Sequence, residues 1–107
     1  MVDYKSYYTR GIKDMKYDIA IIEVRGYVAA VVALDIMLKT ANVELLAYEP
    51  RLGGRLVTII VKGDISSVTA SLKSAVAALQ SEDKVASYAV VANPHKEILK
   101  FYDKEVK

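Results

Sequence analysis

Two arginines, Arg51 and Arg55, flank a short segment that contains the paired glycines Gly53 and Gly54. Arginine stays charged at any physiological pH, so these side chains are candidates for contact with carboxylates or phosphates. Paired glycines ordinarily supply positive φ for a tight turn. The segment is not a nucleotide-binding phosphate loop, because it joins two predicted strands and lacks the Lys-Ser/Thr that would open a helix. From these residues alone, the arginines are ordinary loop charges beside a turn.

No residue pattern predicts catalysis or metal binding. His95 is the single histidine and there is no cysteine, so a metal site would have to be built mainly from carboxylates. Ser, Asp and His are all present, but no local signature joins them into a catalytic triad. We therefore predict a protein that is not an enzyme and has no cofactor and no metal. His95 is interpreted as a polar group in the first turn after Pro94.

The first half of the chain predicts a strand, a helix and a hairpin. A β-branched apolar run that begins at Asp18 and is stopped by Gly26 favours a buried strand. Residues 27–41 are rich in Ala, Leu and Met and predict a helix, in which Asp35 and Lys39 are spaced i,i+4 on an exposed face. Residues 43–48 and 56–61 resume extended patterns, and the Gly-containing loop connects them.

The second half predicts a helix, a strand and a short terminal helix. Asp64 is a candidate N-cap, and apolar residues then recur at intervals of three and four as far as Leu79. Residues 85–92 form a fourth predicted strand, and a short helix is expected from Pro94 to about Tyr102. The resulting α/β order, βαββαβ, is ferredoxin-like, with additions at both ends.

Composition favours one domain that associates with itself. The chain has 107 residues, of which 53% are hydrophobic, more than so small a core readily hides. The net charge of +2 is far from what many phosphate contacts need, so nucleic acid is not a predicted partner. No apolar stretch is long enough to cross a bilayer and no signal peptide is apparent. We predict a cytoplasmic protein without a membrane partner.

Residues 1–17 are polar and rich in tyrosine, and we interpret them as an N-terminal extension of a domain that spans 18–107. The alternation of Val2, Tyr4, Ser6 and Tyr8 is consistent with a weak strand or with a flexible tail, and flexibility is the preferred interpretation.

Four ordered segments resemble the shell domains of bacterial microcompartments (BMC). They are Ile22-Glu23-Val24-Arg25-Gly26, the stretch from Asp35 to Val43, the stretch from Tyr48 to Asp64 that contains the Gly loop, and Asn93-Pro94-His95. The resemblance covers residues 18 to about 102. It implies a structural subunit that forms flat hexamers, which tile into facets around narrow metabolite pores. Its partners would be itself, other shell proteins and encapsulated enzymes.

The resemblance also implies roles for particular residues. Arg51, Leu52, Gly53, Gly54 and Arg55 correspond to the pore loop, where a ring of arginines would favour anions. The family loop is close to Lys-Ile-Gly-Ser-Gly, whereas the corresponding stretch here, Pro50-Arg51-Leu52-Gly53-Gly54-Arg55, is one residue longer and lacks the serine. Lys39 and Asn42 correspond to the hexamer edge. Asn93 stands where the family usually has an arginine that joins neighbouring hexamers, so this contact is expected to be weaker. Some relatives carry N-terminal strands that cap the pore, an alternative role for residues 1–17.

Two other functions share this fold order. A small-molecule-binding regulator is the main alternative, because ferredoxin-like domains also act as ligand sensors. It would remain a smaller oligomer that its ligand stabilises. An RNA-binding domain is disfavoured, since the predicted strand Leu56 to Val61 has no aromatic residue on which bases would stack.

Overall fold

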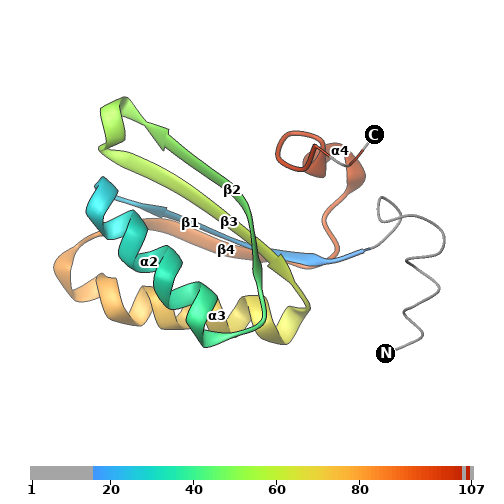
Figure 1. Ribbon diagram of the computed structural model, residues 1–107, viewed down its shortest axis with the longest axis horizontal. Coiled ribbons are helices and arrows are strands. Elements are labelled where there is room, and N and C mark those ends of the chain that lie inside the picture. The colour runs from blue at the N-terminus through green and yellow to red at the C-terminus, as the bar shows by residue number, and fades with distance from the viewer. Residues whose placement is uncertain (1–15, 105, 107) are drawn as a thin grey trace.

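The four predicted strands form one antiparallel sheet. The computed structural model describes residues 16–104 and 106. The strands are β1 (Asp18–Val24), β2 (Glu44–Arg51), β3 (Leu56–Gly63) and β4 (Val85–Val91). They lie in the order β2-β3-β1-β4, so that β2 and β4 are the two edges (Figure 1). This order and the succession of elements confirm the predicted ferredoxin-like α/β fold.

β1 is apolar on both faces because both faces of the sheet are covered where it runs. Ala20, Ile22 and Val24 face the helices, whereas Ile19 packs in a separate cluster with Ile60 on the opposite face. A strand buried on both sides reads as a continuous apolar run rather than an alternation. The pattern that predicted this strand therefore has its physical cause in the two packed layers.

Two helices cover one face of the sheet. They are α2 (Tyr27–Thr40) and α3 (Ile65–Leu79), which pack against each other over the strands (Figure 1). The predicted N-cap of α3 is confirmed, because the Asp64 carboxylate accepts a hydrogen bond of 2.8 Å from the Ser67 backbone N–H. α2 buries the small residues Ala29, Ala30 and Ala33 in the core between the helices and the sheet.

The C-terminal segment lies on the opposite face of the sheet. Its helix α4 spans only Lys96–Leu99 and packs Leu99 against the Ile19–Ile60 cluster. The expectation of a helix from Pro94 to about Tyr102 was therefore too long. The chain continues beyond Leu99 in single turns, in which the backbone N–H of Tyr102 donates to the Leu99 carbonyl at 3.0 Å. His95 caps α4, since its Nδ1 accepts from the Glu97 N–H at 3.0 Å.

Most other boundaries differ from the predictions by one to three residues, the usual uncertainty at element ends. α2 ends at Thr40, before Asn42, and β2 extends to Arg51 rather than stopping at Tyr48. A 3₁₀ turn, η4 (Gln80–Glu82), follows α3. The segment from Val2 to Tyr8, for which a flexible tail was preferred over a weak strand, lies outside the described residues.

Candidate functional site

The Gly-rich loop closes the hairpin between β2 and β3 in a left-handed backbone conformation. Its 3₁₀ turn, η3 (Leu52–Gly54), has φ angles of 53° at Leu52, 68° at Gly53 and 88° at Gly54. A Cβ added at either glycine would meet nothing within 4 Å. Within one chain, the glycines are therefore required by backbone conformation rather than by crowding. Leu52 adopts the same conformation although it carries a side chain, which is 65% exposed.

Arg55 fixes this loop to itself and to the start of α2. Its backbone N–H and its Nε both donate to the Leu52 carbonyl, at 3.3 and 2.8 Å. Its own carbonyl accepts from the Gly26 N–H at 3.2 Å. The loop is therefore hydrogen-bonded to the residue that precedes α2, and the Arg55 guanidinium is held against the loop by the Leu52 carbonyl.

Arg51 is paired within its own strand. Its Nη2 lies 2.8 Å from Oε1 of Glu49, and both side chains are exposed to solvent. Glu49 is two residues earlier, so both side chains project from the same face of β2. This pairing partly neutralises the positive charge that the sequence alone assigned to the loop.

The predicted edge residue Lys39 lies in the last turn of α2, where its Nζ is 3.0 Å from Oδ2 of Asp35. The i,i+4 pair expected from the sequence is thus formed, and the Lys39 side chain remains 76% exposed. Asn42 follows the helix and is also exposed. Its carbonyl oxygen would lie 3.1 Å from a Cβ at Gly63, so the chain after α2 runs close to the end of β3.

Asn93 belongs to the turn after β4 and has a φ of 46°, a conformation that asparagine tolerates better than most residues. Its backbone N–H donates to Oδ1 of Asp18 at 2.7 Å. Asn93 thus lies at the start of β1, and Asn42 lies at the end of β3. These two strand ends are neighbours, because Asp18 pairs with Gly63.

The loop and the edge residues lie at opposite ends of the sheet. Asp18 of β1 pairs with Gly63 at one end, and Val24 pairs with Val57 beside the loop at the other. The seven residues of β1 separate these ends by about 20 Å, at roughly 3.3 Å per residue. Figure 1 shows the β2–β3 turn and the C-terminus of α2 at these two ends.

Sequence reasoning missed a polar cluster where the described chain begins and ends. The Tyr17 hydroxyl donates to the Asp103 carboxylate, and Lys62 Nζ lies 3.8 Å from that carboxylate and 4.9 Å from the Tyr17 ring centroid. Burial raises the pKa of the Tyr17 hydroxyl well above its ordinary value, and the hydrogen bond to Asp103 and its negative charge act in the same direction. Nothing in the local sequence joins residues so far apart in the chain.

Residues 16–104 and 106 contain no group of three or more His, Cys, Asp and Glu side chains placed to hold a metal ion. Over the same residues, no helix has the length and apolar character needed to cross a membrane.

Comparison with known proteins identifies the family. The BMC domain family model matches residues 18–94. The bacterial microcompartment shell protein PduA of Citrobacter freundii is 36% identical over 88 residues, which are 82% of this chain and 94% of that protein. The carboxysome shell protein CcmK2 of Synechocystis is 38% identical over 86 residues, or 78% of this chain and 82% of that protein.

A solved structure agrees with these sequence matches. A microcompartment protein from Desulfitobacterium hafniense superposes with a TM-score of 0.69 at 26% identity, over 80% of this chain and 46% of that longer chain. The chain described here therefore belongs to the BMC domain family. The named relatives are shell proteins rather than enzymes, which confirms the prediction of a structural, non-catalytic protein.

Proposed function

We propose that this chain is a subunit of a bacterial microcompartment shell, which assembles into cyclic hexamers that tile into facets. The observation that carries the proposal is the match of residues 18–94 to the BMC domain, with 36% identity to a shell protein over nearly its whole length. The subunit works by assembling and by letting metabolites pass, and it acts in the cytoplasm. Its partners are its own copies, other shell proteins and encapsulated enzymes.

The separation of the two candidate regions supports this function. In a flat ring, each subunit is a sector whose inner end meets the axis and whose outer end meets the next ring. The loop 51–55 and the residues Lys39, Asn42 and Asn93 lie at opposite ends of the sheet, about 20 Å apart at roughly 3.3 Å per strand residue. One region can therefore face the axis while the other faces the rim.

The proposed pore is lined by Arg51, Leu52, Gly53, Gly54 and Arg55. Repetition around the axis brings about six copies of each charge close together, and such rings select ions by sign. Arg51 is paired with Glu49, and the Arg55 guanidinium donates to a backbone carbonyl, which leaves Arg55 with the less neutralised charge. The pore then favours anions mainly through Arg55, and the exposed Leu52 adds an apolar element.

The proposed contacts between hexamers involve Lys39, Asn42 and Asn93. Lys39 lies in the last turn of α2, and its side chain remains exposed to solvent although it pairs with Asp35. Asn93 is short and holds its position through its backbone N–H, so it offers less reach across an interface than the arginine common in the family.

Analytical ultracentrifugation and electron microscopy of the purified protein test this function. We expect a hexamer of the 11.8 kDa chain and, at higher concentration, extended sheets. A small oligomer that does not grow with concentration, and whose melting temperature rises with a metabolite, would favour the ligand-sensing regulator instead.

A further inference from the structure

Glu23 is the acidic residue of the motif Ile22-Glu23-Val24-Arg25-Gly26, and the proposed function gives it no role. Its neighbours Ile22 and Val24 pack with α2 and α3 in the main core cluster. Successive side chains of a strand point to opposite faces of the sheet, so Glu23 faces away from these two helices. This side of the sheet, on which α4 also lies, is called the α4 face.

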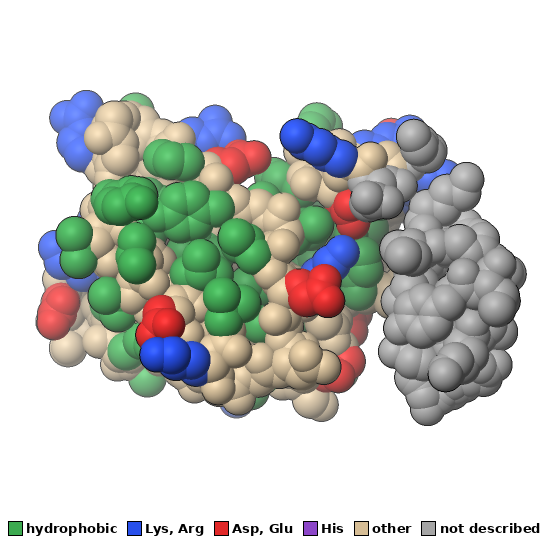
Figure 2. Space-filling view, in the orientation of Figure 1, with side chains coloured by type: hydrophobic (Ala, Val, Ile, Leu, Met, Phe, Trp, Pro, Cys, Tyr) green, Lys and Arg blue, Asp and Glu red, His purple; other side chains and the backbone are tan. Residues whose placement is uncertain are grey.

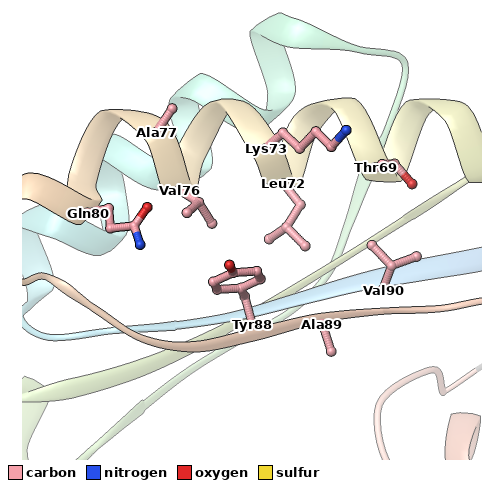
Figure 3. Close-up of a pocket in the computed structure, with 9 residues that line it drawn as sticks. All are labelled: Thr69, Leu72, Lys73, Val76, Ala77, Gln80, Tyr88, Ala89 and Val90. Carbon is pink, nitrogen blue, oxygen red and sulfur yellow. The ribbon is translucent and has the colours of Figure 1, made fainter.

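Hydroxyl groups hold the Glu23 carboxylate from both sides. Thr58 of β3 donates to its Oε2 at 3.2 Å, and Ser87 of β4 donates to its Oε1 at 2.8 Å. Both residues are its direct partners in the sheet register. Figure 3 shows the groove between α3 and β4, with Tyr88 directed toward the helix and Ala89 directed away from it. Ser87, one residue before Tyr88, therefore also faces away from α3, and the carboxylate is fixed on the α4 face.

No lysine or arginine among residues 16–104 and 106 forms an ion pair with this carboxylate. Both of its hydrogen-bond partners are uncharged hydroxyls. Glu49 lies on the same face, because it pairs with Thr58 across β2 and β3, but its carboxylate is 2.8 Å from Arg51. Of these two carboxylates, Glu23 is therefore the one that keeps its full negative charge.

Glu23 lies near the loop end of the sheet. Its partner Thr58 comes two residues after Leu56, where the loop ends and β3 begins. This separation is about 7 Å, at roughly 3.3 Å per strand residue. It is within the screening length of about 8 Å at physiological ionic strength, so the charge of Glu23 acts on an anion held at the loop.

The helix side of the same end has a different electrostatic character. α2 begins at Tyr27, next to Gly26, whose N–H donates to the Arg55 carbonyl at 3.2 Å. The helix has no side-chain cap and no acidic residue in its first turn, and a helix N-terminus carries a partial positive charge. Figure 2 shows mainly hydrophobic side chains over α2 and the adjoining part of β2. The loop therefore lies between a negative surface on the α4 face and a neutral or weakly positive one on the helix side.

We propose that Glu23 is a specificity-determining residue of the pore, which places a ring of negative charge at the mouth on the α4 face. In a flat ring of subunits that lie side by side, the two faces of the sheet become the two faces of the ring. This inference rests on the proposed function and deepens it, because it adds a second charged group beside the loop 51–55. Coulomb repulsion grows with the charge of the anion. Glu23 therefore shifts the preference of the arginine loop from doubly toward singly charged anions.

Binding of inorganic sulfate and of nitrate to the assembled protein tests this role. Glu23→Gln removes the charge and keeps a side chain that can hydrogen-bond to both hydroxyls. At low salt we expect the affinity for nitrate to rise about twofold and that for sulfate about fourfold, because the Coulomb energy doubles with the charge of the ligand. Isothermal titration calorimetry measures sulfate directly and nitrate by competition with sulfate.

Glu44→Gln is the matched control. Glu44 begins β2 and pairs with Lys62, so the same charge is removed from the same sheet about 20 Å away from the loop, at roughly 3.3 Å per strand residue. Both affinities should stay at the wild-type value. Ser87→Asp provides a change of the opposite sign, because it adds a carboxylate beside Glu23 and should weaken sulfate binding more than nitrate binding. Ser87 is exposed, so this variant carries the test if circular dichroism shows that Glu23→Gln is unfolded.

The outcomes separate this inference from the proposed function. If the wild type is a hexamer that binds sulfate, but Glu23→Gln binds it no better than Glu44→Gln does, the role of Glu23 is overturned and the shell function stands. Equal gains for nitrate and sulfate would also overturn it, since a change in loop conformation rather than in charge would be the cause. A hexamer that binds neither anion rejects the inference together with the anion-selective pore. A wild type that stays monomeric at every concentration rejects the proposed function as well.

Discussion

The backbone N–H of Asn93 donates a hydrogen bond to the Asp18 carboxylate at 2.7 Å, and so joins the turn after β4 to the first residue of β1. The side chain of Asn93 takes no part in this bond, which leaves it available at the surface. Its φ of 46° explains the residue type in local terms, because asparagine tolerates the left-handed region. The turn that carries the proposed edge contact is thus fixed by main chain rather than by the side chain that would touch a neighbour.

Asn93→Arg should separate these two roles. We expect it to lower the free energy of unfolding by up to about 1 kcal/mol, because arginine fits the left-handed conformation less well. Sheet formation should be unchanged or stronger, since the longer side chain reaches across an edge. Chemical denaturation and counts of sheets by microscopy measure the two effects. A clear loss of sheets with intact hexamers would contradict the assignment of Asn93 to the edge.

Lys39→Asp should weaken sheet formation and leave the ring intact. The side chain is 76% exposed, so the substitution removes no core contact, but it places two carboxylates at i,i+4 on α2. Like charges at this spacing cost a few tenths of a kcal/mol. Lys100→Asp, on the opposite face of the sheet, is the control for a general effect of charge. Equal tiling by Lys39→Asp and the wild type would reject the edge role.

Glu49→Gln should strengthen the binding of inorganic sulfate to the assembled protein. It removes the carboxylate that lies 2.8 Å from Arg51 and so releases that guanidinium. Arg55→Gln should weaken sulfate binding several-fold, because Arg55 has the less neutralised charge of the proposed pore. Isothermal titration calorimetry at low salt measures both. Lys100→Gln, in the C-terminal segment on the opposite face of the sheet, serves as the control, and equal losses in Arg55→Gln and Lys100→Gln would contradict a pore site.

Gly53→Ala should destabilise the fold by about 1 kcal/mol, because the native φ of 68° disfavours any residue with a Cβ. The cost is conformational, since that Cβ meets nothing within 4 Å. Leu52→Gly at φ 53° should have the opposite sign or little effect, because strain is relieved while unfolded-chain entropy increases. Urea denaturation of both variants checks the pair, and destabilisation of similar size in both would refute the strain argument.

Tyr17 should contribute to stability in a pH-dependent way. Its pKa is raised above the ordinary value of 10.0, so the stabilising neutral hydroxyl is fully present below pH 10 and is lost as the pH rises above it. Tyr17→Phe should lower the free energy of unfolding by about 1–3 kcal/mol near neutral pH, since the hydrogen bond to a carboxylate is lost. Its stability should also fall less steeply above pH 10 than that of the wild type. Thermal melts between pH 7 and 11 record both effects, and parallel curves would contradict this role.

Deleting residues 1–15 should preserve folding and hexamer formation, whereas extending the deletion through Tyr17 should cost stability. The predicted boundary between residues 17 and 18 remains a prediction, and the contacts of Tyr17 with Asp103 motivate the comparison. Circular dichroism and sedimentation of the two truncations measure the difference. Failure of the shorter deletion to assemble would show that the extension has a structural role.

The order of elements and the N-cap at Asp64 could be predicted from the sequence because both depend on neighbours along the chain. The spacing of apolar residues indicates which side of a helix or strand is buried. An N-cap residue marks a helix start because it accepts a hydrogen bond from a free backbone N–H of the first turn. The same local logic predicted the pair between Asp35 and Lys39. The role of the loop around Gly53 came from resemblance, since nothing local distinguishes a pore turn from any other turn.

Other features were decided only by the tertiary structure. The hydrogen bond between Tyr17 and Asp103 joins residues far apart in sequence. The residues around each of them do not indicate that the two side chains meet. The helix α4 is a single turn whose Leu99 packs against Ile19 and Ile60, a contact with distant strands that the local sequence does not indicate. The apolar composition indicated that surface would be left over for a partner. Only the fold divided that surface between the outer face of α2 and the groove beside β4, because which face of a helix is left uncovered depends on where the sheet lies.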